Sequence, residues 1–586
     1  MNPRRSHRGD DKTLNLLTPP DRDRPRAEER EPSAVLDIAL HERVARTRAS
    51  ALWGAYGDAL GFVSELTDVD GLFRRTRGQP LDRSLHWPRR IGGRSGVVVE
   101  LPPGTYSDDT QLRLATSRAI SRGGFDVEAF AKVELPVWPC YALGGGKSTK
   151  AAAGRLARPG TAWFSNAYPG WLEAGGNGAA MRVQPHVWAS HDLKPHSYLA
   201  DVIRNSVCTH GNIRGLAGAA LHAGTLAIAL KTGSLPTPDD LPELLDVIAQ
   251  CPDAVQEDAE LDELWRPAWE RALGTTLVRA WDAAMREVVD ALEPVQKITR
   301  TSGDRARAYG DLLTALNLFD PPNRGNAVST AAVALGLGWL EPDPEAAMII
   351  AANAVGSDTD TIATMAGCLL GAASGKEPSQ ELLDRELIAS DAERVARIAQ
   401  GLDEPGHRYP DLLHWVAPKT QADGLVQTPR GPMVLGLGYA VDMLGEPIPA
   451  PTGNASWQWL RLRSSQTVLI KRRQKLPRIR EGLPDERDDE AGRKTPSTVS
   501  RQSGESGGSP VTSVVDQAPG RQSPRSSRTE ANPPRDVDRA VAWLEEKRYS
   551  DAAIAFVFRS FALEGSVEQM IALATVVRER LRGRDG

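Results

Sequence analysis

Helical periodicity over most of the chain is the feature that most limits its fold. Between about residue 40 and residue 375, stretches rich in alanine and leucine alternate with glycine-rich turns, and apolar residues recur at helical spacing. Alternating β-branched runs are rare in this part, and alanine and leucine favour helices. We therefore expect a large all-α domain. The clearest predicted helices lie at residues 44–61, 111–121, 215–231, 261–292, 327–340 and 346–355.

Composition divides the chain around this helical domain, which we place at residues 38–375. Residues 1–37 form a predicted disordered tail and residues 476–535 a predicted disordered linker, because such polar, proline-containing segments bury too little apolar surface to fold. Residues 376–475 mix glycine, proline and short apolar runs, which predicts an irregular extension packed on the core. Residues 536–584 carry apolar residues at helical spacing and predict a small helical module, which we expect to dock on a protein partner or on the extension.

Charge and cysteine content exclude several classes of protein. The chain of 586 residues has a formal net charge of -5, so it lacks the basic excess typical of nucleic-acid-binding proteins, and we expect no nucleic acid partner. Its 4 cysteines are scattered without a CxxC pair, which argues against a zinc ribbon or a disulfide framework. The sequence shows neither a secretory signal nor an apolar run that suits a membrane span. We expect a soluble, cytoplasmic protein with no membrane partner.

Two short acidic phrases each stand at the start of a predicted helix: Ser-Asp-Asp-Thr at 107–110 and Ser-Asp-Thr-Asp-Thr at 357–361. Serine, threonine and aspartate are preferred helix caps, and acidic residues in a first turn complement the helix dipole, so capping explains either phrase alone. Each phrase also offers more carboxylate and hydroxyl oxygen than a cap requires, and Mg²⁺ and Mn²⁺ prefer such ligands. Because the chain has two such phrases, we interpret them as parts of one two-metal site, and capping is compatible with ligation.

Several other phrases carry weaker chemical signals when each is taken alone. Glu65 ends a stretch of small residues, and a lone carboxylate there is more often an exposed surface group than a catalyst. The glycine-rich segment 175–182 offers backbone N–H groups that suit a diphosphate. Segment 143–149 does not match a P-loop, because Tyr141 stands where that loop requires glycine, although its amides can still contact a phosphate. His210 is a lone histidine, and these are more often structural than catalytic.

In their order along the chain, these phrases resemble the ADP-ribosylglycohydrolase family. That family includes the glycohydrolase that reactivates dinitrogenase reductase, the ADP-ribosylarginine and ADP-ribosylserine hydrolases, and crystallin-like relatives. The resemblance covers residues 44–375. It rests on Gly-Asp-Ala-x-Gly-x-x-x-Glu at 57–65, Ser-Asp-Asp-Thr at 107–110, Gly-Asn-Gly-Ala-Ala-Met-Arg at 176–182, Thr-His at 209–210 and Gly-Ser-Asp-Thr-Asp-Thr at 356–361.

The resemblance implies an all-α fold around two Mg²⁺ or Mn²⁺ ions. It also implies hydrolysis of an N- or O-glycosidic ADP-ribosyl bond, with an ADP-ribosylated protein or small molecule as the partner. No phrase distinguishes arginine, serine, base or O-acyl linkages. The alternative is a protein that binds ADP-ribose without turnover, although crystallin-like relatives tend to lose metal aspartates that this chain keeps. The implied metal ligands are Ser107, Asp108, Asp109, Asp358, Asp360 and Thr361, with Asp360 as the bridge.

Glu65 and Asp109 are the candidate catalytic carboxylates, and which of them handles the proton stays open at this point. Ser107 stands where many relatives have threonine, and segment 144–149 lacks the tyrosine of a Gly-Tyr-Gly-type loop near the phosphates. The implied substrate-binding residues are Gly145, Gly146, Lys147, Gly176, Asn177, Gly178, Ala179, Met181 and His210.

Overall fold

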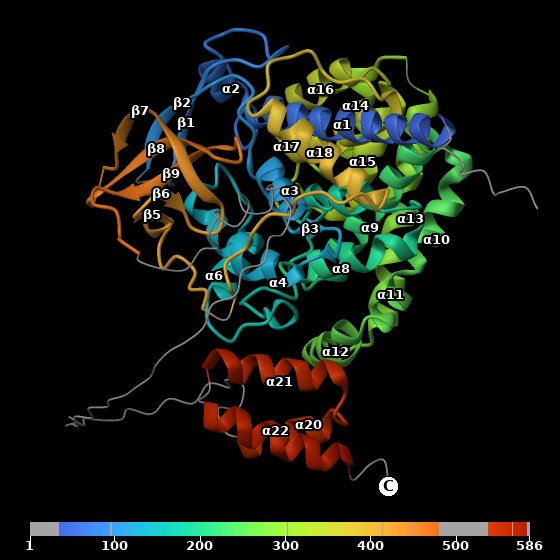
Figure 1. Ribbon diagram of the computed structural model, residues 1–586. Helices are drawn as coiled ribbons and strands as arrows, with labels where there is room; N and C mark the ends of the chain where they lie inside the picture. Colours follow the sequence, from blue (N-terminus) through green and yellow to red (C-terminus); the bar gives the residue numbers. More distant parts are fainter. Residues whose placement is uncertain are drawn as a thin grey trace, which may run out of the picture.

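A computed structural model of the protein shows a mainly helical body with a sheet on one side and three separate helices below it (Figure 1). The predicted all-α class holds for the helical domain apart from two short hairpins. The segment predicted to be an irregular extension instead contains a five-stranded sheet, so all-α is wrong for the chain as a whole. Residues 1–33 and 480–536, which hold most of the predicted tail and linker, lie outside the described residues. The structure describes residues 34–93, 96–301, 303–412, 414–451, 453–479, 537–564 and 567–582.

The helical domain contains long helices and many single turns, together with two short hairpins. Its longer helices are α1 (Ala34–Phe62), α2 (Val69–Thr76), α3 (Asp108–Arg118), α6 (Lys147–Leu156), α8 (Leu199–Val207), α9 (Ile213–Thr232), α10 (Leu241–Ala249), α11 (Cys251–Glu257), α12 (Arg266–Leu273), α13 (Leu277–Thr301), α14 (Arg305–Ala315), α15 (Ala327–Leu340), α16 (Pro344–Asn353), α17 (Thr359–Ser374) and α18 (Arg385–Ala399). Its shorter elements are β1 (Trp87–Ile91), β2 (Val97–Leu101), β3 (Ile120–Ser121), β4 (Gly124–Phe125), α4 (Val127–Ala129), η1 (Phe130–Glu134), α5 (Leu135–Val137), η2 (Trp138–Cys140), η3 (Trp163–Ser165), η4 (Ala180–Arg182), α7 (Gln184–Trp188), η5 (Pro195–Ser197), η6 (Pro238–Asp240) and η7 (Leu261–Trp265).

Small residues let the backbones of α1 and α17 approach each other closely. A β-carbon at Gly57 would lie 2.5 Å from the carbonyl oxygen of Ala363, and one at Gly61 would lie 2.4 Å from that of Thr359. Side chains larger than hydrogen therefore do not fit at this seam. The Thr359 hydroxyl also donates to the Gly61 carbonyl oxygen at 2.8 Å. As a result, the C-terminal end of α1 lies directly beside the N-terminal end of α17.

Helix α9 crosses the middle of the core. It is the one helix among the described residues that is long and apolar enough to cross a membrane, but 89% of the apolar window is buried inside the protein. Burial on that scale is what a central core helix requires. Against it pack α8, α10, α13, α15 and α17.

The sheet comprises β5 (Leu425–Thr428), β6 (Gly431–Val434), β7 (Gly438–Pro449), β8 (Ala455–Leu462) and β9 (Thr467–Arg473), in that order and with every neighbouring pair antiparallel. Short turns connect the strands, with η8 (Gln421–Asp423) before the first. In β9, Val468, Leu469 and Ile470 are all buried, because the sheet is covered on both faces there. Beyond β9, Arg478 forms a bridge with Gln427 in β5, so the described chain continues to pair with the sheet.

The sheet is attached to the helical domain beside the β1–β2 hairpin (Figure 1). A β-carbon at Gly92, at the tip of the hairpin, would lie 3.0 Å from the indole ring of Trp457 in β8. Asp384 joins the two parts directly, since its carboxylate accepts the Tyr106 hydroxyl at 2.8 Å and the Thr467 N–H at 2.7 Å. The strands therefore support the hairpin that carries Arg89.

Three helices near the C-terminus form a small unit of their own: α20 (Val537–Glu546), α21 (Asp551–Glu564) and α22 (Val567–Arg582). They lie below the helical domain, with α21 facing it near α12 (Figure 1). The Phe556 ring lies 5.4 Å from the Phe164 ring, centroid to centroid, and Arg559 forms an ion pair with Glu128. This C-terminal module thus rests on the helical domain itself.

Candidate metal centre

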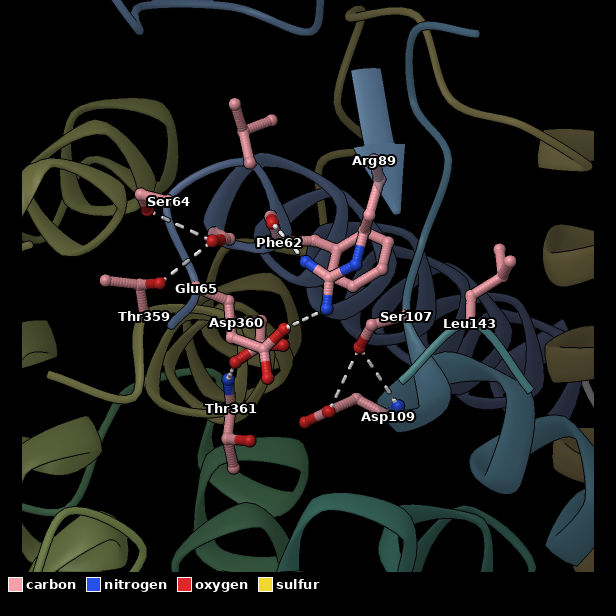
Figure 2. Close-up of polar contacts among 12 residues, drawn as sticks. Phe62, Ser64, Glu65, Arg89, Ser107, Asp109, Leu143, Thr359, Asp360 and Thr361 are labelled. Atoms are coloured by element: carbon pink, nitrogen blue, oxygen red, sulfur yellow. Dashed lines mark hydrogen bonds and ion pairs between the residues drawn. The ribbon is translucent and has the colours of Figure 1, made fainter. Parts of the chain in front are cut away.

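The ends of three helices bring the acidic residues together. Figure 2 shows Glu65, which follows α1, facing Asp360 at the start of α17, with Ser107 and Asp109 from the start of α3 beside them. The carboxylates form two groups of three in which one oxygen of each residue lies within 4.8 Å of the others. Asp360 belongs to both groups. The first group is Asp58, Asp109 and Asp360, and the second is Glu65, Asp358 and Asp360.

Capping of α3 does not use the carboxylates of the first acidic phrase. The Ser107 hydroxyl accepts the Asp109 N–H at 3.3 Å and donates to Asp109 Oδ2 at 3.2 Å. Asp58, which comes from α1, accepts the N–H groups of Ser107 and Thr110, both at 2.8 Å. Asp109 Oδ1 is buried and has no hydrogen-bond partner within the described part of the chain. Because buried polar atoms are normally paired, this oxygen fits a ligand that the protein itself does not supply.

Capping also fails to explain the second phrase. Asp358 stands at the N-cap position of α17 but makes no side-chain capping bond. Its carboxylate instead accepts the Asn177 amide at 2.7 Å. Asp360 Oδ1 accepts the N–H of Thr361 at 2.9 Å, and one oxygen of Asp109 lies within 4.8 Å of one oxygen of Asp360. The two phrases therefore lie side by side.

Burial and mutual repulsion raise the pKa values of these carboxyl groups. Burial, followed by repulsion from Glu65 and Asp58, raises the pKa of Asp108 to about 7. Burial and then Glu65 raise the pKa of Asp358 to about 6, although the hydrogen bond from Asn177 opposes this rise. The pKa values of Asp109 and Asp360 are shifted well upward for the same reasons. A cation among them would remove this repulsion.

Arginines hold Glu65 from two sides. Arg89 on β1 donates to Glu65 Oε2 at 2.7 Å, and its guanidinium stacks on the Phe62 ring at 3.9 Å from the centroid. Arg75 on α2 donates to the backbone carbonyl oxygen of Glu65 at 2.8 Å. The Glu65 side chain is 13% exposed, and Glu65 and Asp358 are the partly exposed members of an otherwise buried group.

The glycine loop before α6 lies against the acidic residues. A β-carbon at Gly144 would lie 2.3 Å from Asp108 Oδ1. Gly145 has φ +118, which favours glycine, and a β-carbon there would meet the Trp138 ring at 2.5 Å. Gly146 and Lys147 are exposed at the start of α6. The cation whose charge reaches Asp108 is Lys150, one turn further along the helix.

The loop 176–182 reaches the acidic residues through one amide and is otherwise fastened to the core. Besides its bond to Asp358, the Asn177 amide donates to the Thr330 hydroxyl at 3.2 Å. Arg182 donates to the Gly178 carbonyl oxygen and to the Thr209 hydroxyl, both at 2.7 Å. Gly176 forms a bridge with Asn326. The buried side chains of Ala179, Met181 and His210 lie around this loop.

His210 is neutral in this environment. Burial and the charge of Arg182 lower the pKa of His210 to about 3, and its Nδ1 lies 2.7 Å from the Thr209 hydroxyl. A β-carbon at Gly178 would lie 3.3 Å from the imidazole ring. The ring therefore packs against the loop that the sequence predicts to bind substrate.

The donor set fits hard divalent cations. It consists of carboxylate and hydroxyl oxygens, which Mg²⁺ and Mn²⁺ prefer, and it includes the unpaired Asp109 Oδ1. Ser107, Asp108, Asp109, Asp358, Asp360 and Thr361 lie at the converging starts of α3 and α17, and of these Asp109, Asp358 and Asp360 belong to the two groups of three carboxylates.

Comparison with known proteins agrees with this geometry. A family model described as ADP-ribosylglycohydrolase matches residues 40–405, more than half of the chain. The chain belongs to the ADP-ribosylglycohydrolase family. The match confirms the resemblance found in the sequence and extends past residue 375 through α18. No curated protein matches the chain. Membership supports a hydrolase that acts on ADP-ribosyl linkages.

Sequence reasoning missed three residues beside the acidic centre of this ADP-ribosylglycohydrolase. Asp58 lies within the 57–65 phrase. It follows Gly57, which packs closely on α17, and this position could have indicated that Asp58 lies near the site. Arg89 gives no signal, because its pairing with Glu65 depends on the β1–β2 hairpin. Lys150 lies one residue beyond the 143–149 phrase, in which Lys147 is the more conspicuous cation.

Proposed function

We propose that the protein is a metal-dependent hydrolase that releases ADP-ribose from a modified acceptor through a centre of two Mg²⁺ or Mn²⁺ ions. The observation that carries this proposal is the position of Asp360, which is shared by two groups of three carboxylates. A shared carboxylate suits two cations about 3.5–4 Å apart, the usual spacing of a two-metal site. The ligands we propose are Ser107, Asp108, Asp109, Asp358, Asp360 and Thr361.

The chemistry at the ribose is the cleavage of a glycosidic bond through a state with oxocarbenium character. The cations would orient the ribose hydroxyls and a water molecule and offset negative charge. Glu65 is placed to transfer a proton, because it is partly exposed and Arg89 fixes its orientation. Asp109 is buried and hydrogen-bonded to Ser107, and its Oδ1 has no partner among the described residues, an arrangement that suits a ligand better than a proton carrier.

Two glycine-rich segments are the proposed site for the diphosphate. Residues 144–147 lead into the N-terminus of α6, where backbone N–H groups point away from the helix. Residues 176–178 lie beside α6, since a β-carbon at Gly178 would lie 3.1 Å from the Thr149 hydroxyl, and Asn177 donates to Asp358. Lys150 adds positive charge at the start of α6, where it already acts on Asp108.

A substrate panel tests the proposal. Purified protein is incubated with arginine-linked, serine-linked, base-linked and O-acyl ADP-ribose, each with Mg²⁺, with Mn²⁺ and with excess EDTA. We expect release of ADP-ribose from at least one linkage with metal and none with EDTA. Release that continues unchanged in EDTA would reject the metal centre. Binding of ADP-ribose without release from any substrate would identify a binding protein instead.

A further inference from the structure

A second cluster of metal-binding side chains lies on the loop between α7 and α8, and the acidic centre does not use it. The cluster consists of His191, Asp192 and His196. Nε2 of His191 lies 3.5 Å from Asp192 Oδ2, and Nε2 of His196 lies 3.2 Å from the same oxygen. One ligand atom from each residue lies within 4.8 Å of the other two.

These distances match the edges of a metal coordination sphere. Zinc binds imidazole nitrogen at about 2.0–2.1 Å and carboxylate oxygen at about 2.0–2.2 Å in tetrahedral geometry, which places neighbouring ligand atoms about 3.3–3.5 Å apart. Both measured separations between nitrogen and oxygen fall close to this range. A single ion can therefore contact all three groups after small side-chain rotations.

Hydrogen bonds within the loop hold the carboxylate in position. The Lys194 N–H donates to Asp192 Oδ1 at 3.0 Å, which leaves Oδ2 facing both histidines. The Ser190 and Ser197 hydroxyls are hydrogen-bonded to each other across the loop, and the Leu193 N–H donates to Ser190 Oγ at 3.0 Å. The loop is thus closed by its own side chains. Supporting bonds of this kind are characteristic of metal ligands.

The loop is also fixed to the helical core. Arg43 on α1 donates to the carbonyl oxygens of Val187 at 3.1 Å, Trp188 at 3.2 Å and Ser190 at 3.1 Å. The two imidazoles remain accessible, since the His191 side chain is 67% exposed and that of His196 is 64% exposed. The cluster therefore combines a fixed base with ligands that an ion in solution can reach.

We propose that this loop is a Zn²⁺ site in which His191 Nε2, His196 Nε2 and Asp192 Oδ2 are the protein ligands and water completes the coordination. The mixed nitrogen and oxygen set selects zinc over Mg²⁺, which prefers oxygen alone. The zinc site and the acidic centre thus take different ions. The ion would add a further cross-link to the loop that joins α7 to α8.

Zinc binding to the full-length protein tests this proposal. The protein is titrated with ZnCl₂ by calorimetry and equilibrium dialysis in excess Mg²⁺, which competes for the acidic centre. The variants are His191→Gln, His196→Gln and the double variant. Loss of a supporting partner alone lowers metal affinity by about 10- to 100-fold, so each single variant should lose at least that much. X-ray absorption of the zinc-loaded wild type should show imidazole nitrogen as a neighbour of the metal.

His414→Gln is the matched control. His414 is exposed, and its Nδ1 lies 2.7 Å from Asp411 Oδ2. Among the described residues this histidine–aspartate pair belongs to no group of three metal-binding side chains. We expect this variant to bind zinc as the wild type does. A repeat in an Asp360→Asn background separates zinc that enters the acidic centre from zinc on the loop. Zinc affinity and stoichiometry unchanged in the double histidine variant, or lowered equally by His414→Gln, would overturn the proposal.

Discussion

Asp360 connects the two groups of carboxylates, and its substitution should separate metal binding from folding. Burial, then repulsion from Glu65 and Asp109, raises its pKa well above the usual range. Without metal, Asp360→Asn removes a repelling charge and should leave the protein at least as stable as the wild type. With Mg²⁺ at 100 times its Kd, the wild type should gain about 2.7 kcal/mol and the variant should not.

Thermal unfolding with Mg²⁺ and with EDTA, together with metal content, measures this difference. We expect Asp360→Asn to lose both bound metal and hydrolysis of ADP-ribosyl substrates. Asp311→Asn, on the exposed face of α14, is the control and should behave as the wild type. Full activity in Asp360→Asn would contradict the assignment of two cations.

Glu65 provides a second test, this time of proton transfer. Glu65→Gln keeps the size of the side chain but removes its proton-transfer capacity, so kcat should fall by about 10²-fold or more. Binding of ADP-ribose, measured by calorimetry, should change little because the aspartates and glycine loops remain. A wild-type rate would leave Glu65 the structural role of pairing with Arg89.

Arg89 offers the matching control for Glu65. If Arg89 acts by orienting Glu65, Arg89→Lys should lower kcat in the wild-type background and cost little more when Glu65 is already glutamine. Residues that act as a unit show such non-additive effects. Equal losses in both backgrounds would show that Arg89 acts independently of Glu65.

The sequence located most residues near the acidic centre but not the partners that orient them. The acidic phrases could be found from the sequence because helix starts and carboxylates are recognised from neighbouring residues alone. Asp58 caps α3 from another helix, and Arg89 reaches Glu65 from a hairpin, so both depend on tertiary contacts. The choice between capping and ligation depends on the structure, in which Asp358 makes no capping bond.

At the level of elements, the close approach of α1 to another backbone could be predicted, but its partner α17 and the sheet could not. Glycines at helical spacing signal close approach, and Gly57 and Gly61 do contact the backbone of α17. The strands give a weaker signal. Residues 468–470 form an apolar run without alternation, because β9 is covered on both faces. Short apolar runs fit helices equally well. The paired register of β8 and β9 is visible only in the structure.

Helix α7 carries a histidine that should make stability depend on pH. His186 is buried against the Phe125 ring at 4.6 Å between centroids, and neither ring nitrogen has a hydrogen-bond partner in the described chain. Burial, followed by the charge of Arg182, lowers the pKa of His186 from 6.5 to about 3. Between these values the unfolded chain binds a proton that the folded chain does not. Burial of the neutral His186 therefore costs no stability above pH 6.5, and the free energy of unfolding falls as the pH drops below 6.5.

His186→Leu should remove this dependence. At pH 5 this group lowers the free energy of unfolding of the wild type by about 2 kcal/mol. The stability of the variant relative to the wild type should therefore be about 2 kcal/mol higher at pH 5 than at pH 8. Chemical denaturation in EDTA measures the free energy of unfolding of both proteins at both pH values. Subtracting the wild-type value from the variant value at each pH cancels the contribution of the acidic centre. The exposed His86→Gln is the control. If the stability difference between variant and wild type is the same at pH 5 and pH 8, the result would contradict a neutral buried His186.

On the scale of the whole molecule, the sheet and the C-terminal module lie outside the family match. The match ends at residue 405, before both of them. The sheet packs beside the hairpin that carries Arg89, which connects it to the acidic centre. The C-terminal module contacts the helical domain through Phe164 and Glu128, and neither belongs to the acidic phrases.

Removal of the C-terminal module should therefore leave the chemistry intact. A chain that ends after Ile479 keeps the pairing of Gln427 with residues 477–479 and loses only residues 480–586. Its turnover of a small ADP-ribosylated substrate should match that of the full chain. Turnover of a protein substrate should fall if the module binds that substrate, because a tethered second contact raises affinity by about 10²-fold or more.

Arg559→Glu in the full chain separates docking from tethering. The substitution places a negative charge against Glu128, so it should release α21 from the helical domain while the module itself stays folded. Limited proteolysis should then cut the released module faster than in the wild type, with the same turnover of the small substrate. Loss of small-substrate turnover in the shortened chain, with the helical domain still folded by circular dichroism, would show that the C-terminal module takes part in catalysis.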